Sequence, residues 1–375
     1  MSFARSAALV AAFAVAVIAI PQVAPAQGGG GSDRVYYRDR AKDGQISVAT
    51  GETKESAGGI QVFAGGKVLK SISAADLLRV EYSKLPGLDD ADRLSANSDE
   101  SKEARDAKDI SRVRTEYAAR SKKAGPGADP KTRRFLDFRE AMWAVRQADG
   151  RTGPDFKVDA AAAVKQLTSF VQLNGKTWEA WPASHAAARL NAEMSLPDEG
   201  KPANGAAFNA AAANLAVLAK NADLPADLRA DAKVSEAEML MRTGAKIAVE
   251  PIAQALGSDK DIPATGPTRD RLTVLQGVLK AATAADAVKV VEAMVAKSAD
   301  AGVRAAARNA LGEFYLMNAK PREAMWEFLW AATVFTQDRD QTLYAHIRLV
   351  AVFEQLGDKT RADDFREKLL RLKAG

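Results

Sequence analysis

The spacing of apolar residues along the chain changes once, near residue 103. Before that point, short runs alternate apolar and polar positions, as in Ile46-Ser47-Val48, and glycine-rich turns separate them. This alternation is typical of half-buried β-strands. The predicted strands span residues 34–38, 45–50, 59–63, 67–72 and 77–82.

From residue 103 onward the apolar residues recur at intervals of three and four, and alanine is abundant. This spacing predicts amphipathic α-helices. Breaks at glycine, proline and aspartate divide the segment into thirteen helices with short links, which favour antiparallel hairpins. Alternate helices recur every 33 to 48 residues, as in a helical solenoid. The helices are expected to begin near residues 103, 131, 157, 177, 205, 225, 245, 268, 285, 301, 321, 341 and 359.

The amino terminus has the pattern of a secretory signal. Arg5 precedes an apolar run at residues 7–20, and Ala24-Pro25-Ala26 forms a small-x-small cleavage site. A helix of that run reaches about 21 Å, short of the ~30 Å hydrocarbon core of a membrane. We therefore expect cleavage before Gln27 rather than a retained anchor. The mature protein would be periplasmic or extracellular, with no transmembrane segment.

Composition divides the rest of the chain into parts. The stretch after the signal is rich in glycine, and a polar, acidic stretch separates the strands from the helices. Five short strands over about fifty residues resemble the small SH3-like or Sm-like barrels. The predicted organisation is a signal peptide at 1–26, a spacer at 27–32, a small five-stranded β-barrel at 33–84, an acidic linker at 85–102 and a helical repeat domain at 103–375.

The strongest repeat signal lies between residues 305 and 335. Large and small residues follow one another in a fixed order there, at Leu311, Gly312, Tyr315, Ala324, Phe328 and Ala331. Only a small residue fits where two paired helices cross, and Pro321 suits the first turn of the second helix. This spacing resembles the tetratricopeptide repeat. The resemblance is specific over residues 301–375 and architectural before them; the usual head tryptophan and final proline are replaced by Arg308 and Thr336.

The resemblance implies a mainly α fold, an α-α superhelix of about six to seven hairpins. In that family the first helix of each hairpin lines a concave groove, which binds proteins or peptides and does no chemistry. The same positions would also suit an ordinary solvated helix face. Carried over by position, the groove side would hold Asn309, Glu313, Met317, Ile347, Ala351 and Glu354.

Candidate chemistry is sparse. The chain has no cysteine, and its two histidines, His185 and His346, have no neighbouring ligand residues, so we expect no metal and no cofactor. The net charge is +5, with basic residues interleaved among acids, which does not favour nucleic-acid binding. No nucleophile motif occurs, and only a hydrolase built from scattered carboxylates stays open.

Two classes of function therefore remain besides that hydrolase. The first is an exported, non-enzymatic scaffold that binds a protein or peptide. The alternative is a cell-wall or glycan binder that uses the barrel, which an aromatic groove at Tyr36, Tyr37 and Phe63 would favour. Trp326 and Trp330 share one helix face. Packing between helices is the default for such a face, but an exposed one would be the best protein-binding candidate.

Overall fold

The fold is described from a computed structural model of the chain. The structure describes residues 32–42, 45–88, 107–125, 127–151, 153–196 and 205–374. The predicted signal peptide lies outside the described residues. So do most of the predicted spacer and most of the acidic linker.

The five predicted strands are confirmed. They form one antiparallel sheet with the order β4-β3-β2-β1-β5. The predicted barrel is wrong, because β4 and β5 are the two edges of an open sheet. The strands are β1 (Asp33–Asp39), β2 (Gln45–Ser56), β3 (Gly59–Ala64), β4 (Lys67–Ser73) and β5 (Leu77–Glu81), with a short 3-10 helix at Arg40–Lys42 after β1.

Helices cover the inner face of the sheet, so the sheet does not have to close on itself to bury that face. Val35 and Val80 pair across β1 and β5 and belong to the same apolar core as the first helices. Tyr82, just after β5, packs edge-on against Phe135 of the second helix, with ring centroids 5.7 Å apart. Sheet and helices therefore share a core, and a separately folded barrel is not needed to bury the strands.

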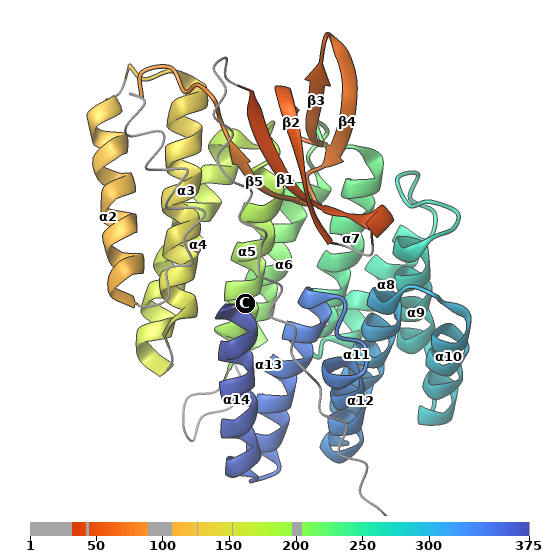
Figure 1. Ribbon diagram of the computed structural model, residues 1–375. Coiled ribbons are helices and arrows are strands. Elements are labelled where there is room, and N and C mark those ends of the chain that lie inside the picture. Colours follow the sequence, from red (N-terminus) through yellow and green to blue (C-terminus); the bar gives the residue numbers. More distant parts are fainter. Residues whose placement is uncertain are drawn as a thin grey trace, which may run out of the picture.

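Thirteen helices follow in the part of the chain that the structure describes, and each begins within four residues of its predicted start. Consecutive helices pack side by side as hairpins (Figure 1). They are α2 (Ala107–Ala124), α3 (Pro130–Asp149), α4 (Gly153–Asn174), α5 (Ala180–Glu193), α6 (Gly205–Ala219), α7 (Ala226–Met241), α8 (Lys246–Leu256), α9 (Pro267–Lys280), α10 (Ala284–Lys297), α11 (Ala301–Met317), α12 (Pro321–Thr333), α13 (Arg339–Gln355) and α14 (Lys359–Ala374). No described helix is long and apolar enough to cross a membrane.

The α11–α12 crossing has the geometry that the repeat spacing predicts. A Cβ atom added at Gly312 would lie 2.7 Å from two ring carbons of Phe328. Leu311, Ala324 and Ala331 are fully buried around the same crossing, and Phe328 is almost fully buried. Only glycine at position 312 lets the ring of Phe328 lie against the α11 backbone.

The helical array returns on itself at its carboxyl end. Helix α13 packs against α5, and α14 packs against α3, near the middle of the molecule (Figure 1). Leu343 and Ile347 of α13 share an apolar cluster with Ala188 of α5, Phe208 of α6 and Met239 of α7. The face that an open superhelix would leave free is thus covered in part by the chain's own last hairpin.

Candidate functional site

The most exposed aromatic surface of the helices is one face of α12. Trp326 is 61 % exposed and Trp330 is 45 % exposed. They lie four residues apart, so they share a face of the helix. Val334, just beyond the end of α12, is exposed beside them. Packing between helices, the default expectation for these two tryptophans, is therefore wrong.

The same helix buries its opposite side. Ala324, Phe328 and Ala331 of α12 are buried against α11 and α13. The other three tryptophans of the chain, Trp143, Trp178 and Trp181, are also buried. The α12 pair therefore stands out as large aromatic area left in water, which monomeric soluble proteins keep small unless a surface has a partner.

Contacts on one side hold the Trp330 ring in place. Phe335 stacks on it with ring centroids 6.4 Å apart and an interplanar angle of 27°. The Arg308 guanidinium lies 5.4 Å from the ring centroid. Arg308 forms ion pairs with Glu327 at 3.0 Å and with Glu292 at 2.9 Å, and these pairs fix the position of its guanidinium. A ring held this way loses little side-chain entropy on binding.

The predicted groove residues fall into two groups. Met317, Ala351 and Glu354 are partly exposed, and Glu354 accepts an ion pair from Arg366 of α14 at 2.5 Å. The other three, Asn309, Glu313 and Ile347, are buried. A solvated helix face does not describe these three, and no open groove exposes them.

The two buried polar groove residues have partners from helices far along the chain. The Asn309 Nδ2 atom donates to the Gln341 carbonyl oxygen at 3.0 Å and to its side-chain Oε1 at 2.9 Å. The Glu313 carboxylate accepts two hydrogen bonds from Arg348, at 2.5 and 2.7 Å. The spacing of either residue on α11 gave no sign of these partners, which lie on α13.

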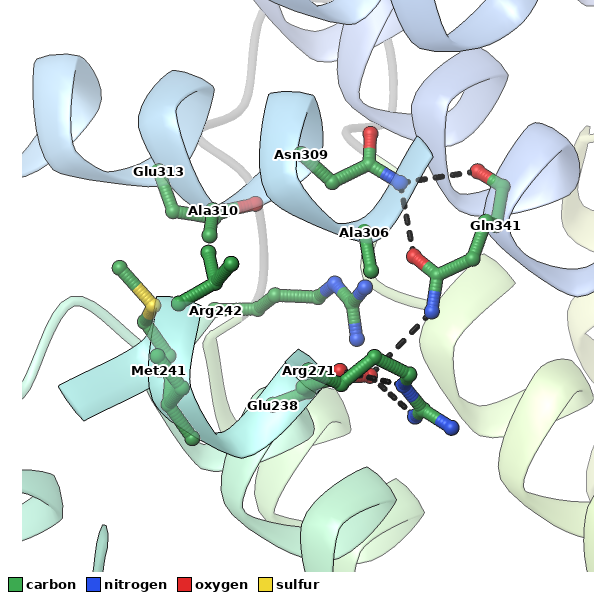
Figure 2. A pocket seen from close by; sticks show the side chains of 11 residues that line it. Glu238, Met241, Arg242, Arg271, Ala306, Asn309, Ala310, Glu313 and Gln341 are labelled. Atoms are coloured by element: carbon green, nitrogen blue, oxygen red, sulfur yellow. Dashed lines mark hydrogen bonds and ion pairs between the residues drawn. The ribbon is translucent and has the colours of Figure 1, made fainter. Parts of the chain in front are cut away.

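Both residues line a small recess between the inner helices (Figure 2). Helices α7, α9, α11 and α13 supply its walls, and it has room for about one water molecule. Arg242, at the end of α7, extends its guanidinium toward the middle of this recess (Figure 2). The recess is lined by Glu238, Met241, Arg242, Arg271, Val274, Leu275, Ala306, Asn309, Ala310, Glu313 and Gln341.

The main carboxylate of the recess is already neutralised. Glu238 accepts hydrogen bonds from Arg271 Nε at 2.9 Å and Nη2 at 2.7 Å, and from Gln341 Nε2 at 3.2 Å. Burial raises the pKa of Glu238, but its neighbours, above all Arg271, outweigh burial and leave the pKa lowered. Glu238 is therefore ionised at neutral pH and is poorly suited to act as a proton donor or acceptor.

Two of the three aromatic residues of the candidate groove, Tyr36 and Tyr37, lie on opposite faces of the sheet. Tyr36 pairs with Val48 and Arg79, while the adjacent Tyr37 is buried on the other face of the sheet. The Arg79 guanidinium lies 4.0 Å from the Tyr36 ring centroid. Because neighbouring residues of a strand point to opposite faces, Tyr36 and Tyr37 cannot flank the same ligand.

The two histidines make structural contacts. His185 lies against Trp181, with ring centroids 4.5 Å apart, and its Nδ1 atom is 3.8 Å from Asp340 Oδ2. His346 Nδ1 lies 2.9 Å from the Thr342 carbonyl oxygen. Within the described residues, no group of three or more histidine, aspartate or glutamate side chains is placed to hold a metal ion.

Comparison with known protein families finds no family model that matches the chain. Comparison with curated proteins finds no match either. The tetratricopeptide resemblance therefore rests on the residues of the α11–α12 hairpin and on the packing of consecutive helices.

Proposed function

We propose that this chain is a non-enzymatic protein-binding scaffold and that the exposed tryptophan face of α12 contacts its partner. The observation that carries the proposal is the exposure of Trp326 and Trp330 on one face. Tryptophan is enriched among the few residues that dominate protein–protein binding energy. The carboxylates of Glu292 and Glu327 around Arg308 would supply a polar rim beside the aromatic centre.

This proposal moves the contact surface from the inner to the outer side of the array. The inner positions Asn309, Glu313 and Ile347 are covered by the chain itself. The tryptophan face needs no rearrangement to meet a partner. It also stands on the hairpin where the repeat resemblance is most specific, so a rigid helix pair presents it.

A glycan-binding function through the sheet has less support. Sugar recognition through aromatic faces needs rings that flank one ligand, and Tyr36 and Tyr37 lie on opposite faces of the sheet. A hydrolase has less support too, because the buried carboxylates Glu238 and Glu313 are held by arginines. We propose export as well, on the sequence of residues 1–26.

Site-specific photo-crosslinking in the cells that make the protein tests the proposal. A benzophenone side chain replaces Trp326 in the full chain, and a matched control carries it at Leu173, which is 83 % exposed on α4. We expect a discrete cross-linked product of higher mass from position 326 and none from position 173. The double variant Trp326→Ala/Trp330→Ala, probed with benzophenone at the nearby Val334, should lose that product.

Two results would overturn the proposal. One is the absence of a cross-linked product from position 326, or the appearance of the same product from position 173. The other is a product whose mass and peptides are those of two copies of this chain. In that case light scattering would show an oligomer that Trp326→Ala/Trp330→Ala converts to a monomer, and the face would be a self-association surface.

A further inference from the structure

One guanidinium in the recess between the inner helices lacks a carboxylate partner. Arg242 is only 5 % exposed, and it makes no ion pair with any residue that the structure describes. Arginine keeps its charge in proteins, so deprotonation does not relieve this burial. A buried charge is costly unless it is paired and hydrogen-bonded.

The side-chain contacts of Arg242 are with a sulfur atom and an aromatic ring. Its Nη1 atom donates to the Met239 sulfur at 3.2 Å, and thioether sulfur is a poor acceptor. The Tyr344 ring lies 4.3 Å from the guanidinium carbon. A guanidinium has five N–H donors, and in Arg242 none of them meets an oxygen acceptor among the described residues.

The carboxylates near Arg242 are bound to other arginines. Glu238 is held by Arg271 through two hydrogen bonds, and Glu313 is held by Arg348 through two more. Arg271 also donates a hydrogen bond to Asp231 at 2.6 Å. Glu238 and Glu313 do act on Arg242 through space and favour its charged form, yet burial outweighs them and lowers the Arg242 pKa.

The recess matches the free side of the guanidinium in size and in chemistry. Arg242 extends into it between Ala306 and the Glu238–Arg271 pair (Figure 2). Val274 and Leu275 make part of its wall apolar, and the polar side chains of Asn309 and Gln341 in the lining are bonded to each other. The space admits about one water-sized species, which suits a halide and is too small for sulfate or phosphate.

We propose that this recess is a binding site for a monovalent anion of halide size, held by the Arg242 guanidinium. A water molecule there would accept hydrogen bonds but bring no negative charge into contact with the guanidinium. An anion would supply both an acceptor and the opposite charge. Because four helices far apart in the sequence wall the recess, binding would stabilise their closed arrangement. The proposal is independent of the tryptophan face.

Thermal unfolding of the full chain in different sodium salts tests the proposal. At equal ionic strength, chloride or bromide should raise the melting temperature in a saturable way above the value in gluconate, which is too large for the recess. Arg242→Gln should abolish this halide-specific rise. Arg229→Gln, which removes a guanidinium paired with Asp261, should keep it. A rise of equal size in Arg242→Gln, or none in the wild type, would overturn the proposal.

A crystallographic measurement on the unaltered chain covers the case in which Arg242→Gln does not fold. Crystals soaked in bromide should show an anomalous peak within hydrogen-bonding reach of the Arg242 guanidinium. If bromide occupies other sites in the same crystals and no peak lies at Arg242, the recess does not bind halide and the proposal fails.

Discussion

The Lys373 ammonium lies 2.5 Å from Glu193 Oε1, although 180 residues separate them along the chain. Both side chains are almost fully buried. The pair joins the last turn of α14 to the last residue of α5, and so closes the helical array between its carboxyl end and its middle. Burial raises the Glu193 pKa, while Lys373 and then Arg189 act to lower it.

Removing the lysine alone should destabilise the closed array. Lys373→Met leaves Glu193 buried with only the longer contact to Arg189, at 3.7 Å. Breaking a buried pair typically costs about 3–5 kcal/mol, and Arg189 should reduce this to about 3 kcal/mol. Urea unfolding measures the loss.

The matched control removes both charges at this contact. Glu193→Leu/Lys373→Met takes the charges out together, and replacing a buried ion pair by apolar residues is often neutral or stabilising. The double variant should therefore recover most of the stability lost in Lys373→Met. If Lys373→Met changes the unfolding free energy by less than about 0.5 kcal/mol, the pair does not hold the array closed.

Gly312→Ala should destabilise the α11–α12 hairpin. Alanine gains about 1 kcal/mol of helix propensity over glycine, but its Cβ would lie 2.7 Å from the Phe328 ring. Overpacking of this kind costs about 1–3 kcal/mol, so a net loss is expected in chemical denaturation. Gly312→Ala/Phe328→Leu should recover part of it.

A second glycine provides the comparison for this substitution. At Gly150 the nearest atom to an added Cβ is 3.7 Å away, and the backbone φ is −81°. Gly150→Ala should therefore stay within about 0.5 kcal/mol of the wild type. Equal losses at positions 150 and 312 would contradict the steric explanation for the repeat's small residue.

Two aromatic residues of α12 should respond very differently to alanine. Phe328 is 1 % exposed, and Phe328→Ala should cost about 3–5 kcal/mol. Trp326 is 61 % exposed, and Trp326→Ala should cost less than about 1 kcal/mol in the same denaturation experiment. A large loss at Trp326 would mean that this side chain is retained for the fold, and that its exposure is not evidence of a partner.

Local signals in the sequence were sufficient to predict the helices. Asp129 caps α3 by accepting hydrogen bonds from Lys131 and Thr132, and Pro130 begins the helix, so its start is encoded within four residues. Pro321 likewise stands at the first position of α12. Hairpins of consecutive helices followed from the short links, because no long-range information is needed to pack neighbours.

The errors all concern contacts between distant parts of the chain. The strands were predicted correctly, but whether a sheet closes depends on what covers it, and Phe135 of α3 covers this one. The tetratricopeptide resemblance placed Glu313 on the groove side of its helix. Its partner Arg348 comes 35 residues later, on α13, and no spacing rule links the two. The exposure of Trp326 likewise depends on whether a distant helix packs on that face of α12.

The pH dependence of stability should include a term from His346. Burial lowers the His346 pKa below its ordinary value, so the unfolded chain takes up a proton more readily than the folded one. Stability from this residue is therefore complete above the unfolded pKa of about 6.5 and declines as the pH falls below it. Between about pH 7.5 and 5.5, His346→Leu should lose less unfolding free energy than the wild type.

Buried carboxylates partly oppose the loss of stability that His346 causes on acidification. The measurement is therefore the difference between His346→Leu and the wild type, not the pH profile of the wild type alone. Burial raises the pKa values of Glu179 and Glu193 in the folded chain, so their protonation on acidification stabilises the folded state of the protein. Both groups are unchanged in His346→Leu and cancel in the comparison. Equal losses in the two proteins would show that His346 titrates alike in the folded and unfolded chains.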